Sequence, residues 1–396
     1  MAFFMLESRV KNMITGIDIL RKQGFGLLRG KRVGLLSHQA ALTADGSTSA
    51  QLLRRSLGQR LVALYGPEHG FCGQVGAGGR VTTRRHPDWH IPVHSLYGRD
   101  RAPTPDMLKH IDVMVCDLQD LGVRCYTYLA TLRGTLTACA ANNVEVVVTD
   151  RPIPLPQTVD GPLTDPALSS FVAPCALPLA YGMTPAESAR WLRDTHGLNL
   201  TLTTVPMEGW RRADSAWDGR RPAFMPPSPG IRTWESALCY AATVFTEALP
   251  GIDCGRGTNM AFRVLGAPWL RAEAFCALPD IRRLKGVTLR PYSYVAAAGP
   301  HAGREIEAVR LTVTDHTRFR PVETSAVLLR TLAETYGTTR VWRHKGVRPA
   351  WFDQLYGTES VRRWLLDGKP LPLLFNAWRQ ASRDFRHARK SALLYK

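Results

Sequence analysis

The amino-acid sequence predicts an α/β fold, with a parallel, doubly wound sheet in its first part and an α+β second part. Between residues 16 and 150, short apolar segments alternate with helical patterns, as they do in consecutive β-α-β units. Three of these segments are almost continuously apolar, which is typical of strands covered on both faces. A proline-rich segment at 151–166 then separates this region from one with mixed helix and strand patterns.

Five segments of the first region are predicted to be strands: 31–37, 61–65, 91–96, 111–117 and 144–150. Helices are predicted between them. Thr104 can cap a helix that begins at Pro105, because proline at the first helical position loses no hydrogen bond. A longer helix is expected at 128–143, directly before the last of the five strands.

The segment 151–166 holds five prolines. Neither a helix nor a sheet interior tolerates that density, so the segment is predicted to be a connector. After it, Thr184 and Glu187 have the spacing of a capping box, which predicts a helix that ends near Gly197. Further strands are expected at 200–207 and 307–315, and further helices at 324–337 and 359–368. We expect two domains, at 14–165 and 166–396.

The composition is that of a globular protein, with 45% hydrophobic and 21% charged residues in a chain of 396. This is enough material for two domains of ordinary size. The net charge of +18 suggests attraction to anionic partners. However, the basic residues are dispersed, and no nucleic-acid-binding motif accompanies them, so we expect no nucleic-acid partner.

The eight cysteines form no C-x-x-C pair, and we expect neither disulfides nor a zinc site. The first acidic residue, Glu7, comes too early for the apolar region of a signal peptide. No stretch approaches the roughly 20 apolar residues that span a membrane. The sequence therefore predicts a cytoplasmic protein without a membrane segment, although a start further upstream could hide an export signal.

No cofactor or metal ion is expected either. The glycine-rich segment 73–79 follows a predicted strand, but it has neither the dinucleotide-binding spacing nor a Walker lysine. His86, His90 and His94 recur every fourth residue, but Pro87 and Pro92 prevent the helix that would align them as ligands.

Polar side chains follow the ends of four of the five predicted strands. In chain order these are Ser37, His38 and Gln39; Glu68 and His69; Gln119, Asp120, Arg124, Tyr126 and Tyr128; and Asp150 and Arg151. In an open parallel sheet, ligands bind beyond the carboxyl ends of the strands. These residues are therefore predicted to line a pocket for a polar, hydroxyl-rich ligand.

Each of these residues also has a structural interpretation. Asp120 could cap the following helix, Asp150 could pair with Arg151 or Arg124, and His69 could bond only to a neighbouring turn. Tyr126 and Tyr128 could simply begin a helix. Glu68 is the strongest candidate, because its turn after a core strand is a partly desolvated position, and desolvation suits a carboxyl group to general acid catalysis.

Several ordered motifs resemble the exo-β-N-acetylmuramidase family. They include ALYGPEHGFCG, CDLQDLGVRCYTY, PPSPGIRTWESALCY and GRGTNMAF, and the likeness extends from about residue 14 to the C-terminus. The resemblance implies a Rossmann-like N-terminal domain and an α+β domain, with the active site in the cleft between them. It also implies release of N-acetylmuramic acid from the non-reducing end of peptidoglycan-derived glycans (MurNAc-β-1,4-GlcNAc type).

The resemblance further implies that Glu68 is the catalytic acid. The second catalytic group stays open among Asp120, Asp150, Glu247 and the acetamido group of the substrate. Arginines are expected to bind the lactyl carboxylate of muramic acid with two parallel hydrogen bonds, and the candidates are Arg124, Arg151 and Arg256. For Arg151, pairing with a nearby aspartate is the alternative.

Several positions depart from the family pattern. Gln74, Gly76 and Gly79 stand where the family usually has acidic residues, Ile153 stands where it usually has asparagine, and Cys254 ends the acidic loop that contains Glu247. These departures motivate an alternative function, that of a catalytically weak or inactive homologue that binds muramyl sugars.

Overall fold

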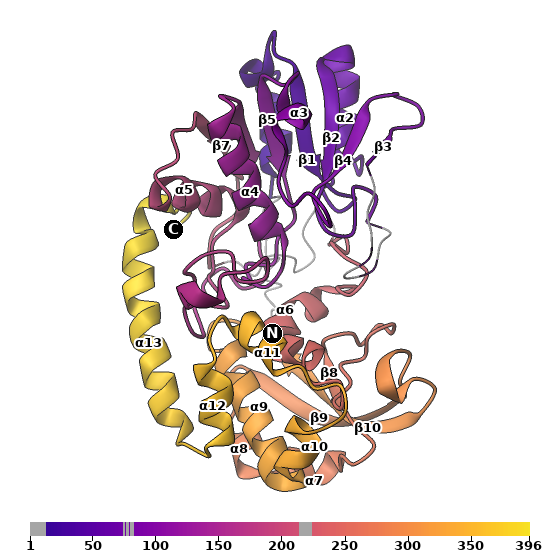
Figure 1. Ribbon diagram of the computed structural model, residues 1–396, viewed down its shortest axis with the longest axis vertical. Helices are drawn as coiled ribbons and strands as arrows, with labels where there is room; N and C mark the ends of the chain where they lie inside the picture. Colours follow the sequence, from indigo (N-terminus) through magenta and orange to yellow (C-terminus); the bar gives the residue numbers. More distant parts are fainter. Residues whose placement is uncertain (1–12, 74–75, 77–78, 80–82, 214–223) are drawn as a thin grey trace, which may run out of the picture.

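The computed structural model describes residues 13–73, 76, 79, 83–213 and 224–396, which form two domains (Figure 1). The N-terminal domain is built on a seven-stranded sheet with the order β3-β4-β2-β1-β5-β6-β7. Its strands are β1 (Val33–Ser37), β2 (Leu61–Gly66), β3 (Arg84–Arg85), β4 (Pro92–Ser95), β5 (Val113–Asp117), β6 (Glu145–Thr149) and β7 (Leu202–Val205). All neighbouring strands are parallel except β3, which is antiparallel to β4. The predicted α/β class and parallel sheet are confirmed.

Helices cover both faces of this sheet. They are α1 (Gly16–Lys22), α2 (Ser49–Leu57), α3 (Pro105–Leu108), α4 (Tyr128–Ala141) and α5 (Pro185–Thr195). Ile17 of α1 and Leu53 of α2 pack with Leu35 of β1 on one face. Leu132 of α4 and Ala189 of α5 belong to the cluster on the other face, together with Leu36 of β1. The strand is apolar at successive positions because both of its faces are covered.

The sheet extends beyond residue 165, where we expected the first domain to end. The predicted helix with the Thr184–Glu187 capping box is α5, and its cap is present. The strand expected at 200–207 is β7, which pairs with β6. The proline-rich connector therefore interrupts the N-terminal domain instead of ending it, because the chain returns to the sheet after leaving its edge.

The C-terminal domain combines helices with a three-stranded antiparallel sheet of order β8-β10-β9. Its strands are β8 (Val264–Gly266), β9 (Val287–Val295) and β10 (Glu305–Val313). Its helices are α6 (Trp234–Thr243), α7 (Ala272–Ala277), α8 (Pro279–Arg282), α9 (Pro321–Tyr336), α10 (Thr338–Trp342), α11 (Pro349–Tyr356), α12 (Ser360–Leu366) and α13 (Leu371–Ala388). The predicted strand at 307–315 and the predicted helices at 324–337 and 359–368 correspond to β10, α9 and α12. Nowhere in the described parts of the chain is a helix both long and apolar enough to cross a membrane.

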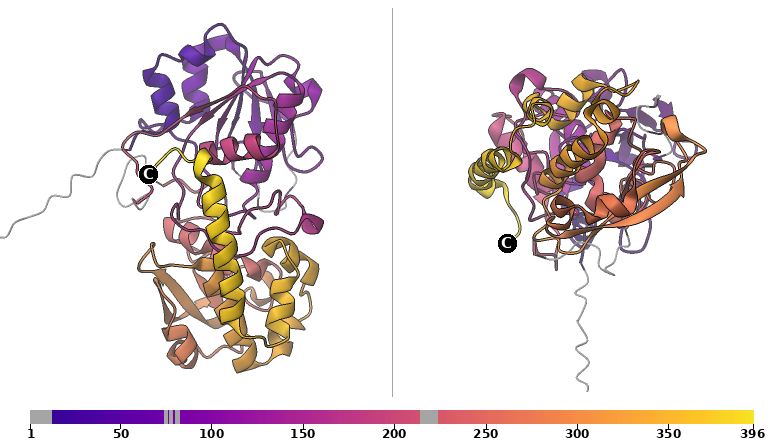
Figure 2. Two further views of the ribbon diagram at one scale, coloured as in Figure 1. Left: turned by 90° about the vertical axis from the view of Figure 1, so that its left-hand side faces the viewer. Right: turned by 90° about the horizontal axis from the view of Figure 1, so that it is seen from below.

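The long helix α13 runs alongside both domains, and the chain then ends against the N-terminal domain (Figure 2). The Arg389 side chain donates 2.6 Å hydrogen bonds to the carbonyl oxygens of Tyr181 and Gly182. The Tyr395 hydroxyl donates to Asp150 at 2.6 Å. The last residues of the chain therefore tie the C-terminal domain back to the first sheet.

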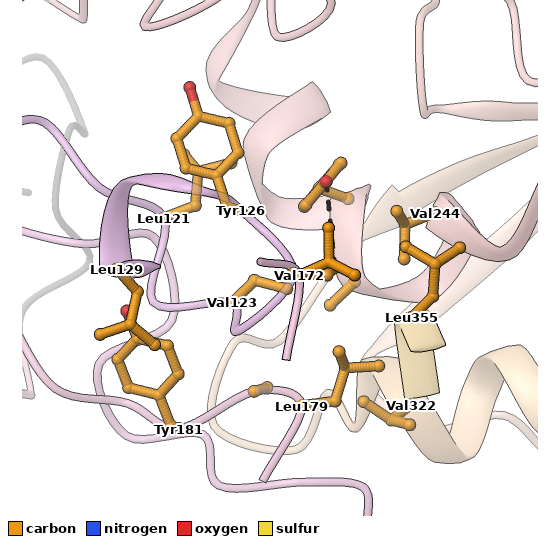
Figure 3. Packing of buried hydrophobic residues seen from close by; sticks show 14 of the residues in the cluster. Leu121, Val123, Tyr126, Leu129, Val172, Leu179, Tyr181, Val244, Val322 and Leu355 are labelled. Carbon is orange, nitrogen blue, oxygen red and sulfur yellow. Dashed lines mark hydrogen bonds between the residues drawn. The ribbon is translucent and has the colours of Figure 1, made fainter. Parts of the chain in front are cut away.

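A continuous apolar core also joins the two domains (Figure 3). It contains Val123 from the loop after β5, Leu179 from the segment between β6 and α5, and Val322 and Leu355 from the C-terminal domain. Leu179 is fully buried in this cluster. Since one core is shared, the two domains are expected to hold a fixed relative position.

Truncating the shared core should destabilise the whole protein. We expect Leu179→Ala to lower the free energy of unfolding by about 2–5 kcal/mol, as buried leucine truncations do. The matched control is Leu373→Ala on α13, whose side chain is 58% exposed and whose loss should cost less than about 0.5 kcal/mol. Urea unfolding measures both, and equal effects would contradict the assignment of Leu179 to a shared core.

Candidate active site

The loops that follow β1, β2, β5 and β6 meet at the carboxyl edge of the parallel sheet. His38, after β1, accepts a 2.9 Å hydrogen bond at Nε2 from the main-chain N–H of Gln119, after β5. Burial, together with the nearby Arg151 and His69, lowers the pKa of His38 to about 3. His38 is therefore a neutral acceptor that links these loops, which converge as the strand-end pattern predicts.

Glu68 lies on the tight turn that ends β2. His69 has a φ of +71° and Gly70 a φ of +77°, and a left-handed backbone at a histidine stores strain of the kind that gathers at functional sites. At Gly66, an added Cβ would lie 2.4 Å from the main-chain nitrogen of Phe71. The turn therefore depends on these residues and presents Glu68 at the edge of the sheet.

One hydroxyl group orients the Glu68 carboxylate, and a second lies near it. The Thr127 hydroxyl, in the loop before α4, donates to Glu68 Oε2 at 2.6 Å. The Tyr97 side chain, in the loop after β4, lies near Glu68, and burial and then the charge of Glu68 raise the pKa of its phenol to about 12. Glu68 is only 7% exposed and is held by Thr127.

Glu247 brings a second carboxylate to this place from the C-terminal domain. It ends the short helix η4 (Val244–Glu247), which follows α6, and it forms an ion pair with Arg256. Burial is the main cause that raises the pKa of Glu247, and the charge of Glu68 adds to it. The two glutamates therefore interact across the domain junction, where Gln39 donates to the carbonyl of Pro226 at 3.1 Å.

Arg124 and Arg151, which we expected to bind a substrate carboxylate, are buried and form hydrogen bonds inside the protein. Arg151 donates from Nε and Nη2 to the two oxygens of Asp117, at 2.6 and 2.8 Å. Arg124 donates to the carbonyl oxygens of Pro162 at 3.0 Å and Leu355 at 3.3 Å. These placements argue against direct ligand contact by either arginine. The alternative in which Arg151 pairs with an aspartate matches the structure, with Asp117 as the partner.

Asp120 and Asp150 also point into the fold. Asp120 accepts from the Gly122 N–H at 2.8 Å and from the Tyr181 hydroxyl at 3.2 Å, and burial raises its pKa to about 6. Asp150 accepts from Thr184, from the Ala186 N–H and from Tyr395, and burial raises its pKa to about 7. Asp150 therefore accepts hydrogen bonds from donors at the start of α5 and from the end of the chain, which is a structural role.

Three further candidates lie in the loops after β2 and β5. Gln119 donates its side-chain amide to the Pro152 carbonyl at 2.7 Å. Tyr126 is buried and packs against Tyr128, with ring centres 4.7 Å apart. His69 is 6% exposed, and its charge influences His38. Gln119 and Tyr126 thus support the loops, while His69 stands next to Glu68 on the same turn.

Sequence reasoning missed three residues of this arrangement: Tyr97, Thr127 and Asp117. Tyr97 follows the third predicted strand, at 91–96, whose end we left out of the strand-end pattern. Applying the same rule to all five strands would have found it. Thr127 stands between two tyrosines that we selected, and its role depends on the position of Glu68.

Two of the positions that depart from the family pattern are Gln74 and Cys254. Gln74 is outside the described residues, whereas Cys254 is buried as a free thiol next to Arg256.

Within the described ranges, no three His, Cys, Asp or Glu side chains are grouped as a metal ion would require. A cavity of about 670 Å³ lies in the C-terminal domain between α8, α9 and α13, and none of the residues above lines it.

Comparison with known proteins identifies related sequences along nearly the whole chain. Residues 33–235 match the family model described as exo-beta-N-acetylmuramidase NamZ, N-terminal, and residues 238–395 match its C-terminal counterpart. The chain is 34% identical over 382 residues to the peptidoglycan beta-N-acetylmuramidase NamZ of Bacillus subtilis (strain 168). That alignment covers 96% of this chain and 91% of the relative.

Two crystal structures of DUF1343 family proteins from Bacteroides fragilis NCTC 9343 are similar to this one. The first has a TM-score of 0.89 at 30% identity and covers 98% of this chain and 100% of its own. The second has a TM-score of 0.75 at 23% identity and covers 97% and 99%. The second likeness bears on the fold alone.

The buried pair of Asp117 and Arg151 yields a stability prediction. Arg151→Met leaves the carboxylate of Asp117 buried and unpaired, which should cost about 3–5 kcal/mol in the free energy of unfolding. Adding Asp117→Asn removes the stranded charge and should recover a large part of that loss. A stable Arg151→Met protein with altered ligand preference would instead mean that Arg151 contacts the ligand.

Asp150 should make stability depend on pH. Its pKa rises from 3.8 to about 7 in the folded state, so the native protein holds the extra proton. The contribution of Asp150 to stability is therefore complete in acid and is lost as the pH rises to about 7. Between about pH 5 and pH 8, wild-type protein should lose a few degrees of Tm relative to Asp150→Asn, which does not titrate. Parallel Tm curves would contradict the raised pKa.

Proposed function

Because the chain belongs to the exo-β-N-acetylmuramidase NamZ family, we propose that it is a glycoside hydrolase acting on terminal N-acetylmuramyl residues. The substrates proposed are glycans derived from peptidoglycan, of the MurNAc-β-1,4-GlcNAc type, with release of N-acetylmuramic acid from the non-reducing end. The observation that carries this proposal is the Glu68 carboxyl group, held by Thr127 at the carboxyl edge of the sheet.

Glu68 acts as the general acid in this proposal. It donates a proton to the glycosidic oxygen as the bond to the leaving sugar breaks, which spares that sugar from leaving as an alkoxide. The Thr127 hydroxyl holds the carboxyl group in one orientation. Such fixed positioning lets the proton transfer begin from the bound complex without reorganisation.

Glu247 is proposed as the second carboxyl group of the reaction. Among the three candidates from the sequence, Asp120 and Asp150 are occupied by donors inside the N-terminal domain. Glu247 is the one whose charge interacts with Glu68. Burial raises the pKa of Glu247, and its ion pair with Arg256 opposes that rise. In its carboxylate form, Glu247 can activate water, attack the anomeric carbon or stabilise its positive charge.

Experiments in solution and in cells test the proposed activity and the predicted location. A chromogenic β-N-acetylmuramide tests the reaction directly, and release of the chromophore by folded protein supports a hydrolase. Calorimetric binding of N-acetylmuramic acid without any release would favour the muramyl-sugar-binding alternative. The cytoplasmic location stays a prediction, and cell fractionation checks it.

The central prediction concerns Glu68→Gln, which keeps the shape of the side chain but removes the transferable proton. Loss of general acid catalysis should lower kcat by about 10²–10⁴-fold, with little change in Tm. The control is Glu273→Gln, an exposed position at the start of α7, which should leave the rate unchanged. Wild-type activity in Glu68→Gln would show that the turn is only structural.

Glu247→Gln separates the possible roles of the second carboxyl group. If Glu247 reacts directly, the rate should fall about as far as with Glu68→Gln, by at least about 10²-fold. If the acetamido group of the substrate is the nucleophile, a thiazoline analogue of the sugar should inhibit the wild-type enzyme strongly. A near-normal rate in Glu247→Gln would remove this residue from the mechanism.

A further inference from the structure

A row of three side chains leads outward from the Glu68 carboxyl group. Its first member, Tyr97, lies near Glu68, whose charge raises the pKa of the Tyr97 phenol. The Tyr97 ring lies next to the Phe171 ring, with 5.8 Å between ring centres. The guanidinium carbon of Arg101 lies 5.0 Å from the centre of the Phe171 ring. The row therefore begins at the proposed catalytic acid and ends at a cation.

These side chains come from two separate segments. Tyr97 and Arg101 belong to the loop between β4 and α3, and Phe171 belongs to the segment between β6 and α5. Tyr97 and Phe171 are half-buried, whereas Arg101 is exposed. Aromatic side chains with a few placed polar groups are the usual lining of a small-molecule site.

Arg101 differs from Arg151 and Arg256 in its ion pairing. Considering the residues that the structure describes, no carboxylate forms an ion pair with Arg101, whereas Arg151 and Arg256 each have one. The cation–π contact with Phe171 favours one position of the guanidinium. A guanidinium carries five N–H donors, and those that do not meet the ring can bind a ligand. Arg101 is thus a positioned cation that no carboxylate of the described residues pairs with.

The charge of Arg101 also reaches the catalytic end of the row. Burial and Glu68 raise the pKa of the Tyr97 phenol, whereas the positive charge of Arg101 lowers it. Tyr97 and Arg101 also both contact the Phe171 ring, which places Arg101 within reach of a sugar bound beside Tyr97. Arg256, in contrast, is held by Glu247.

We propose that Arg101, held over Phe171, binds the carboxylate of the 3-O-lactyl group of the terminal muramyl residue. This inference rests on the proposed function. The lactyl group distinguishes N-acetylmuramic acid from N-acetylglucosamine, and it is a carboxylate at neutral pH. A guanidinium matches that carboxylate with two parallel hydrogen bonds. Arg101 thereby takes the specificity role that we first expected of Arg124, Arg151 and Arg256.

The test compares three chromogenic substrates: a β-N-acetylmuramide, its lactyl methyl ester and a β-N-acetylglucosaminide. The variant is Arg101→Gln. We expect its KM for the free acid to rise about five- to thirtyfold, the range of a charge-assisted hydrogen bond partly screened by solvent. The kcat should change little, because the lost contact is equal in the ground and transition states. The ester and the glucosaminide should react as with the wild-type enzyme, since they lack the carboxylate.

Arg99→Gln is the matched control. Arg99 lies on the same loop, its side chain is 96% exposed, and it faces only Asp100 at 3.9 Å. Its replacement removes the same charge from the protein, so an equal rise in KM would reduce the effect of Arg101 to general electrostatics and overturn the proposal. Arg101→Lys should restore only part of the affinity, because an ammonium group cannot make the paired contact.

Phe171 provides a second, independent variant. Phe171→Leu removes the platform and should raise the KM for the free acid in the same direction as Arg101→Gln, whereas Phe171→Tyr should preserve it. If Arg101→Gln handles all three substrates as the wild-type enzyme does, the proposal is wrong.

Failure of the proposed function would be recognised separately. In that case the wild-type protein releases no chromophore from any substrate. Calorimetry with N-acetylmuramic acid and N-acetylglucosamine still tests the inference, because Arg101→Gln should abolish the preference for the acid. Equal binding of both sugars by wild-type protein would overturn the inference itself.

Discussion

The buried ion pair between Asp117 and Arg151 is the interaction on which the carboxyl edge of the sheet depends. Asp117 ends β5 and Arg151 follows β6, and their side chains are fully or almost fully buried. Asp117 also accepts from Ser49 at the start of α2. The pair therefore joins two strands and a helix beneath the loops that carry His38, Gln119 and Glu68. Either charge alone would be strongly unfavourable there, so each residue requires the other.

Acidic residues of the same chemical type serve different purposes at this edge. Asp117 is neutralised by a guanidinium, whereas Asp120 and Asp150 are satisfied by neutral donors and have raised pKa values. Glu68 differs because its turn carries it past the end of β2, where the Thr127 hydroxyl orients it. Burial and partner, and not residue type, therefore separate a structural carboxyl group from a candidate catalytic one.

The proposed reaction site needs both domains. Glu68 comes from the first sheet, Glu247 from the helix after α6, and the contact of Gln39 with Pro226 closes the junction between them. The shared core around Leu179 and the return of the chain end to Asp150 hold this arrangement. A site assembled in this way is as rigid as the interface beneath it, which suits chemistry that depends on positioning.

The sequence by itself determined the features that depend on neighbours along the chain. Apolar runs predicted the parallel strands, Thr184 and Glu187 predicted the cap of α5, and Glu68 was found because a turn follows a core strand. Only the tertiary structure decided the partners that come from elsewhere in the chain. Arg151 resembled a ligand-binding residue until Asp117, 34 positions away, was found beside it. Arg101 and Tyr97 gained a possible role through Phe171 and Glu68. The physical reason is that periodicity and capping act over a few residues, whereas ion pairs, burial and ring contacts form between segments that only folding brings together.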